Sequence, residues 1–246
     1  MSTSIFQVFA ASLLPTAAMA GAGSIAAWRA PGPALRSAIL HFAAGVVFSV
    51  VAVELLPDVV KGHAPVQVIV GFAIGVAVML GIRSFTRRAE GAEEKTKREG
   101  TSALPWGLLT AVGVDIAIDG LLLGIAFAAG AKEGFLLTLA LTIEVFSLGL
   151  ATAASLRQEG LPVGGTIAVV GSLSLLFLVG GGAGATLLHG LPGHALEIVL
   201  SFGLAALLFL VTEELLVEAH EAAETPALTA AFFGGFLLFL ILGMMG

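Results

Sequence analysis

The chain has 246 residues, of which 58% are hydrophobic and 11% are charged, with a mean hydropathy of +1.05 and a formal net charge of -6. These values lie outside the range of soluble domains and indicate a polytopic membrane protein, whose partners we expect to include the lipid bilayer and no nucleic acid. The chain contains no cysteine, so a disulfide framework and a thiolate metal site are both excluded.

Eight segments are long and apolar enough to cross a bilayer, which takes about 20 residues. Proline, glycine and charged clusters separate them. They cover approximately residues 4–28, 35–57, 65–86, 104–129, 133–157, 162–189, 193–219 and 226–245. The first segment lacks the positively charged start of a signal peptide and is too long for one, so we expect it to be a helix. The sequence predicts a single all-α transmembrane domain over 1–246, with a flexible, solvated connector at about 87–103.

The basic residues predict the orientation of the eight helices. With the N-terminus outside, nine of the 11 Lys and Arg residues lie on the inner side, namely Arg29, Arg36, Arg83, Arg87, Arg88, Lys95, Lys97, Arg98 and Arg157. Only Lys61 and Lys132 then lie outside. Because cytoplasmic loops carry an excess of Lys and Arg, we expect both termini outside a plasma or inner membrane and the 87–103 connector in the cytoplasm.

Three carboxylates lie in the middle of two apolar segments whose interiors contain no basic residue. Asp115 and Asp119 are four residues apart, which places them on one helix face within about 6 Å. Glu144 lies at a comparable depth in the next, antiparallel helix. A charge at the centre of a membrane-spanning helix costs roughly 2.5–3.5 kcal/mol, so such residues usually face a bundle interior or a watery cavity.

These carboxylates would repel one another, so they should either bind a cation or hold protons. Ligation by oxygen alone suits hard or borderline divalent cations. Ser147, one turn beyond Glu144, adds a hydroxyl or holds a bound water. The alternative is that protonated acids hydrogen-bond between helices without any metal.

An internal repeat relates the second and seventh segments at an offset of 160 residues. Glu54 aligns with Glu214, and Asp58 aligns with Glu218. In the predicted orientation the two helices run in opposite directions, so the repeat is inverted, which is typical of transporters with a substrate site near the midplane. We therefore expect Glu54 and Asp58 toward the outer end of a cation pathway and Glu214 and Glu218 toward the inner end.

Three histidines lie near the predicted pathway. His41, near the inner end of the second helix, either meets the acids of the seventh helix or hydrogen-bonds to a neighbour. His63 is either a cation-gathering residue at the outer mouth or a solvated loop residue. His220 follows Glu218 at the inner end of the seventh helix, where acids could accept released metal, although a solvated helix end would look the same.

The pattern of glycines indicates helix packing and not a nucleotide-binding loop. Gly71 and Gly75 in the third helix, and the run 180–184 in the sixth, allow close helix approach or bending. The chain has no phosphate-binding loop of the Walker type, so transport driven by its own ATP hydrolysis and an organic cofactor are not expected. The sequence is better explained by transport in which one group of helices moves against another. Such transport would run down a gradient of the substrate or be coupled to protons through the carboxylates.

These segments resemble the ZIP (Zrt-, Irt-like) family of divalent metal transporters over nearly the whole chain. The motifs are HFAAGVVFSVVAVELLPD at 41–58, TEELLVEAHE at 212–221, Asp115-Ile-Ala-Ile-Asp119-Gly120, and Ile143-Glu144-Val-Phe-Ser147. The resemblance implies a bundle of three plus two plus three helices and a homodimer. It also places Asp115, Asp119 and Glu144 at metal-ligand positions, with Glu213 or Glu214 completing the site.

Two histidines of the family motifs are replaced here by Asp115 and Ile143, and Ser147 stands in place of a second ligand. Nitrogen ligands favour zinc over manganese or magnesium, so their loss weakens the case for zinc in particular. We therefore expect a divalent metal ion as substrate: zinc, iron, manganese or cadmium.

Two other classes of function compete with transport. One is a metal-binding membrane scaffold or sensor that does not transport. The other is an intramembrane aspartyl hydrolase, since paired aspartates can share a proton and activate water. Asp115 and Asp119 lie on one helix without a second catalytic motif, so we expect a transporter and not an enzyme.

Overall fold

The computed structural model of the chain describes residues 5–29, 31–98, 105–187, 191, 193–220 and 225–245. All regular structure within these ranges is helical, which confirms the all-α prediction. Eight helical segments of the described chain are long and apolar enough to cross a membrane. The protein is therefore an integral, multi-pass membrane protein.

The eight segments agree closely with the predicted ones because length and hydropathy are sufficient to identify membrane spans. They are formed by α1 (Ile5–Trp28), α2 (Pro33–Val50) with η1 (Val51–Leu55) and α3 (Leu56–Lys61), α4 (Pro65–Arg98), α5 (Trp106–Ala129), α6 (Ala131–Gln158), α7 (Val163–Leu187), α8 (Gly193–Phe209) with η2 (Leu210–Leu215) and α9 (Leu216–Ala219), and α10 (Pro226–Met245).

Proline marks the start of three of these helices. α2, α4 and α10 begin at Pro33, Pro65 and Pro226. Proline suits the first helical position because its fixed φ is already helical and its missing N–H has no intrahelical acceptor there. Before α10, the Oγ1 of Thr225 also accepts a hydrogen bond of 3.4 Å from the backbone N–H of Leu228.

The connector predicted at 87–103 is wrong over most of its length, because α4 continues as a helix to Arg98. In the sequence, Glu93 and Glu94 lie four residues before Lys97 and Arg98. Acids placed four residues before bases support a helix by ion pairing along one face. The rest of the predicted connector, residues 99–103, lies outside the described residues.

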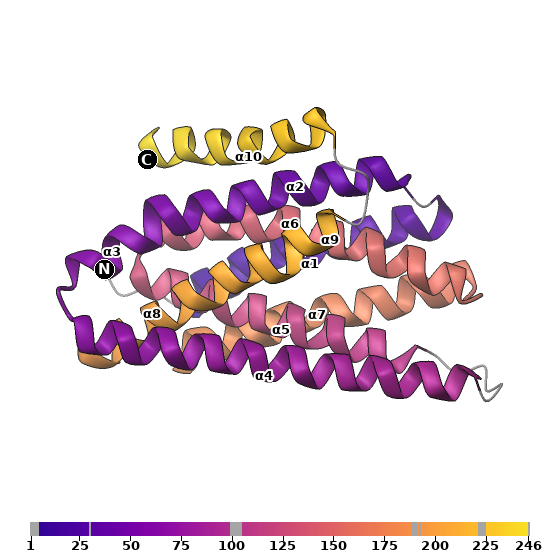
Figure 1. The fold of residues 1–246 in the computed structure, drawn as a ribbon, viewed down its shortest axis with the longest axis horizontal. Coiled ribbons are helices and arrows are strands. Elements are labelled where there is room, and N and C mark those ends of the chain that lie inside the picture. Colours follow the sequence, from indigo (N-terminus) through magenta and orange to yellow (C-terminus); the bar gives the residue numbers. More distant parts are fainter. Residues whose placement is uncertain are drawn as a thin grey trace.

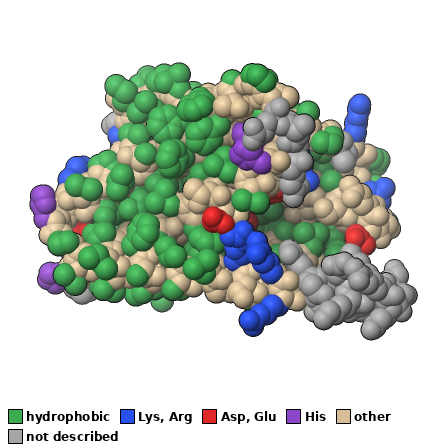
Figure 2. All heavy atoms as spheres, in the orientation of Figure 1, with side chains coloured by type: hydrophobic (Ala, Val, Ile, Leu, Met, Phe, Trp, Pro, Cys, Tyr) green, Lys and Arg blue, Asp and Glu red, His purple; other side chains and the backbone are tan. Residues whose placement is uncertain are grey.

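The helices lie side by side along one long axis (Figure 1). The main packing partners are α1 with α6, α5 with α7, α2 with α10, and α4 with α8. α2 and α8 run in opposite directions, and the start of α1 lies at the same end as the end of α10 (Figure 1). Hydrophobic side chains cover most of the face in Figure 2, as expected where lipid is the solvent.

Glycines let pairs of helices approach until their backbones touch. A Cβ atom at Gly71 would lie 2.2 Å from the carbonyl oxygen of Ile198, so α4 approaches α8 closely here, which is one of the two roles expected for this glycine. A Cβ at Gly75 would lie 2.8 Å from the carbonyl oxygen of Phe202, and one at Gly235 would lie 2.2 Å from that of Phe42. Gly75 and Gly235 are 160 residues apart, and so are their partners Phe42 and Phe202. The same contact therefore occurs twice, at the offset of the repeat.

The predicted glycine run in α7 brings that helix against α5, which carries both candidate aspartates. A Cβ at Gly180 would lie 2.1 Å from the carbonyl oxygen of Ala117, and one at Gly184 would lie 2.8 Å from that of Leu121. Close backbone packing of this kind fixes α5 in the bundle. The two aspartates are therefore held by a rigid element.

Two π-helical segments interrupt the long helices of the repeat. η1 covers Val51–Leu55 and η2 covers Leu210–Leu215. Val51 and Leu55 are 160 residues from Val211 and Leu215, so the π segments fall at corresponding positions. Short π segments inside α-helices are rare and occur frequently at functional sites. Each segment carries one acid of the repeat, Glu54 or Glu214.

Candidate metal site

Three carboxylates converge in the interior of the bundle, between α5 and α6. Asp115, Asp119 and Glu144 each offer an oxygen, and these atoms all lie within 4.8 Å of one another. The structure thus brings together the three residues that the sequence singles out. Oxygens spaced in this way can share one cation, since Ca²⁺, Mg²⁺ and Zn²⁺ bind oxygen at about 2.0–2.6 Å.

The donor atoms of this group are buried and lack partners. Asp119 and Glu144 are 1% and 2% exposed. Both carboxylate oxygens of Asp119, Oε2 of Glu144 and Oγ of Ser147 have no hydrogen-bond partner within the part of the chain that the structure describes. Buried polar atoms are almost always hydrogen-bonded, so such a group calls for an explanation. A cation held by these oxygens would satisfy them together.

The neighbouring acids Glu213 and Glu214 have different surroundings. The carboxyl of Glu214 interacts electrostatically with those of Asp115, Asp119 and Glu144. Glu213 instead accepts a hydrogen bond from the guanidinium of Arg83, with which it forms an ion pair. Of the two acids that the family resemblance offers for the site, Glu214 is therefore the one beside the three carboxylates.

A cavity of about 550 Å³ leads from this group toward the end of the bundle where α2 begins. We call this the basic end, because Arg36, Arg83 and Arg87 line the cavity there. Asp115 and Glu214 lie on its wall, whereas Asp119 and Glu144 do not. In Figure 2 most of the charged side chains on the visible face gather toward this end. Asp115 thus stands between the buried oxygens and the cavity.

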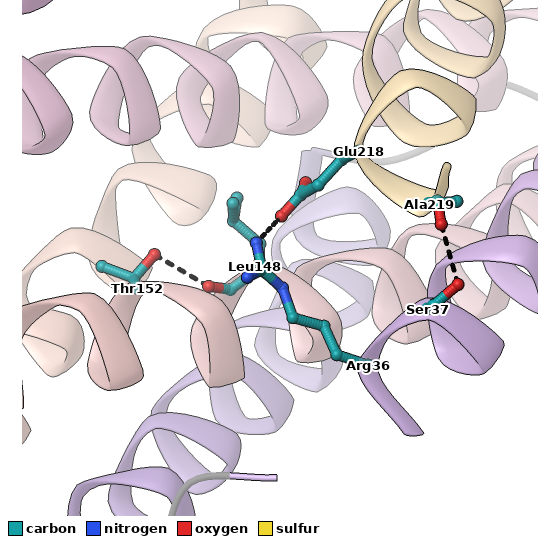
Figure 3. A network of polar contacts seen from close by, with 6 residues as sticks. All are labelled: Arg36, Ser37, Leu148, Thr152, Glu218 and Ala219. Atoms are coloured by element: carbon teal, nitrogen blue, oxygen red, sulfur yellow. Dashed lines mark hydrogen bonds and ion pairs between the residues drawn. The ribbon is translucent and has the colours of Figure 1, made fainter. Parts of the chain in front are cut away.

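Polar contacts join the helices around this cavity (Figure 3). Arg36 of α2 donates a hydrogen bond to Glu218 of α9, and the two form an ion pair. The hydroxyl of Ser37 donates to the carbonyl oxygen of Ala219 at 2.7 Å. These contacts tie the start of α2 to the end of the α8–α9 segment. Glu218 is therefore paired with an arginine at the predicted inner end of the pathway.

The two histidines at the basic end lie against each other. The rings of His41 and His220 have their centroids 5.1 Å apart. Nδ1 of His41 is 2.9 Å from the carbonyl oxygen of Ser37 on its own helix. Of the two arrangements considered for His41, the structure shows a histidine hydrogen-bonded to its neighbour. The acids at 221 and 224 that follow His220 lie outside the described residues.

The acids expected at the outer end of the pathway lie at the end opposite the basic end. Asp58 pairs with Lys61 on the same helix at 3.0 Å. Glu54 is 8% exposed, and its Oε1 lies 3.5 Å from Nζ of Lys132. His63 lies in the turn before α4 and has a φ of 49°.

Sequence reasoning did not identify the partners of these acids. The pairs Arg36–Glu218 and Arg83–Glu213 join residues more than 100 positions apart, and no local spacing links them. Lys132 could have been linked to Glu54, because the predicted orientation already places both at the outer end. The π segments have no residue signature, but the 160-residue offset places both at corresponding positions.

The donors of the site are carboxylate and hydroxyl oxygens, and the described residues place no histidine among them. Such a set prefers hard and borderline divalent cations. A scan against models of protein families finds no match to this chain, and a search of the curated proteins finds none either.

Proposed function

We propose that this protein transports divalent metal cations across the membrane by alternating access to a site formed by Asp115, Asp119 and Glu144. The observation that carries the proposal is the convergence of these buried carboxylates within 4.8 Å at the inner limit of an open cavity. Intramembrane acids that meet in this way usually mark an ion path. Ser147 and Glu214 are the additional oxygen donors of the proposed site.

The orientation of the transporter is proposed from its charges. The basic end faces the cytoplasm, because Lys and Arg are enriched in cytoplasmic loops, and both termini lie outside. The cavity then opens inward, so this conformation would release a cation to the cytoplasm. The membrane proposed is the plasma or inner membrane.

Alternation is proposed to arise from an inverted repeat. The opposite directions of α2 and α8, the paired π segments and the glycine contacts repeated at an offset of 160 residues all support it. Two similar halves of opposite direction can form two similar conformations, one open to each side. Glu54 would then contribute to the pathway when it opens outward, as Glu214 does when it opens inward.

The proposed substrates are zinc, iron, manganese and cadmium, without an organic cofactor. We also propose membership of the ZIP family and a homodimer on the basis of the resembling motifs. Because the site contains only oxygen donors, manganese or iron should compete well with zinc.

Metal flux into proteoliposomes tests the function. The purified protein should take up at least one of zinc, manganese, iron or cadmium faster than magnesium, and Asp119→Ala or Glu144→Ala should abolish that uptake, because either removes a buried donor. Glu159→Gln, an exposed acid beyond the end of α6, serves as the matched control and should transport at the normal rate.

Uptake at normal rates by both site variants, with folded protein in the membrane, would overturn the proposal. Metal binding that depends on Asp119 and Glu144 but is accompanied by no flux would instead establish a scaffold or sensor. The same buried oxygens support that second function, because binding alone satisfies them.

A further inference from the structure

Lys132 joins three helices at the end of the bundle opposite the cavity. Its Nζ donates a hydrogen bond of 2.7 Å to the carbonyl oxygen of Gly243 and lies 3.5 Å from Oε1 of Glu54. The three residues belong to the start of α6, the end of α10 and η1. The side chain of Glu54 is 9% exposed and that of Lys132 is 39% exposed. A cation tethered near the surface is therefore bound to a carboxylate that is almost buried.

The two oxygens around this ammonium, Oε1 of Glu54 and the carbonyl oxygen of Gly243, could also bind a free cation. Gly243 lies in the last described turn of α10, and its carbonyl oxygen accepts the hydrogen bond of Lys132. Its missing side chain is needed as well, because a Cβ atom there would lie 2.5 Å from Oε1 of Glu54. A carboxylate and a backbone carbonyl are the ligand types that hard cations prefer.

The corresponding position at the basic end is occupied differently. Glu214, 160 residues after Glu54, lies beside Asp115 and faces the open cavity. Gly243 itself corresponds to Arg83, which pairs with Glu213 and leaves Glu214 toward the carboxylates. At the basic end Glu214 is thus available to the pathway. At the opposite end its counterpart Glu54 is bound by Lys132.

We propose that Oε1 of Glu54 and the carbonyl oxygen of Gly243 form a second cation site, which Lys132 occupies as a tethered ammonium while that end is closed and which an arriving divalent cation takes from it. The displaced ammonium can move into solvent, because the side chain of Lys132 is already 39% exposed. Loss of its two bonds then releases the start of α6 from the end of α10 and from η1. This inference rests on the proposed transport function. In it, Lys132 couples the arrival of the metal to the opening of the end opposite the cavity.

A single cysteine reports on this end, since the natural chain has none. Val50, one turn before Glu54, is 2% exposed. In Val50→Cys protein, Lys132→Gln should increase the rate of modification by an impermeant thiol reagent, added at the opposite end, about tenfold, because a charge-assisted hydrogen bond that keeps this end closed is lost. Lys61→Gln is the matched control: it makes the same change of charge at the same end, where the exposed Lys61 pairs with the partly exposed Asp58 on its own helix, and should leave the rate unchanged.

The cation site itself is tested with manganese alone. Manganese should increase modification in the parent protein, because it takes the place of Lys132 on Glu54 and opens this end. It should have less effect in the Lys132→Gln protein, which is already open, and none once Glu54→Gln is added. Gly243→Ala provides a second route if Lys132→Gln does not fold, since its methyl group displaces the carboxylate of Glu54 and should also increase modification.

Equal modification rates in Lys132→Gln and Lys61→Gln proteins would overturn the inference, as would a manganese effect that persists without Glu54. Labelling requires no flux, so its outcome is separable from that of the transport assay. A protein that opens on loss of Lys132 but moves no metal would retain this second site and lose the transport function.

Discussion

Glu213 and Glu214 are adjacent in the sequence but have different partners, and this difference predicts different mutant behaviour. Glu214→Gln should weaken metal binding about 10- to 100-fold, the range found when a group supporting metal ligands is removed. Glu213→Gln breaks an ion pair whose acid is 44% exposed, which should cost about 0.2–1 kcal/mol of stability and change metal affinity little.

Metal titration calorimetry in detergent, with thermal unfolding of each variant, separates these effects. The two variants serve as controls for each other, because each replaces one carboxylate by an amide at neighbouring positions. A loss of affinity in Glu213→Gln as large as that in Glu214→Gln would contradict the assignment of Glu214 to the site.

At this scale the sequence predicts which residues lie in the site better than it predicts their pairing. The four-residue spacing of Asp115 and Asp119 and the depth of Glu144 follow from helix geometry, so their convergence is predictable. The choice between Glu213 and Glu214 depends on the π segment, which rotates the side chains by an amount that no residue type signals. The arginine partners arise from packing of distant helices and are invisible to local patterns.

At the scale of the helices, adjacent glycines in α10 provide a matched pair of variants. Gly235→Ala places a methyl group against the carbonyl oxygen of Phe42, at 2.2 Å, and should lower stability by about 1–3 kcal/mol because backbone must shift. Gly234→Ala meets no atom within 4 Å and should be neutral or stabilising by up to about 1 kcal/mol, since alanine favours helix.

Thermal unfolding of both variants in the same detergent measures the difference. Equal stabilities would show that α2 and α10 do not approach closely at this point, and would remove one of the contacts that support the proposed inverted repeat.

The helical segments are predictable because hydropathy and punctuation by proline determine them, and the structure confirms all eight. Only the end of α4 differs from the prediction, because the helix continues to Arg98 through a sequence that is rich in charged residues and has no apolar face. Charge-rich stretches can be solvated helix or connector, and composition alone does not distinguish the two.

At the scale of the whole molecule, the cavity at the basic end and the Lys132 contacts at the other end correspond to one of the two conformations that the proposed alternating access requires. The other conformation should close the cavity and expose the region around Val50. We therefore predict opposite changes in two reporter cysteines, one at Val50 and one at Ala111 on the cavity wall. A ligand shifts such an equilibrium only by its differential affinity for the two conformations.

In this conformation Ala111→Cys should react readily with an impermeant thiol reagent added at the basic end, while Val50→Cys resists reagent added at the opposite end. Adding transported metal, or imposing a proton gradient, should change the two rates in opposite directions. Gln158→Cys, exposed at the end of α6, should react at one rate throughout and corrects for effects of the reagent. Because both reporters sense one equilibrium between two conformations, the fraction of protein gained by one conformation should equal the fraction lost by the other. If both sites react equally under every condition, or if they change in the same direction, the halves do not alternate, and the buried carboxylates are better explained as a fixed binding site.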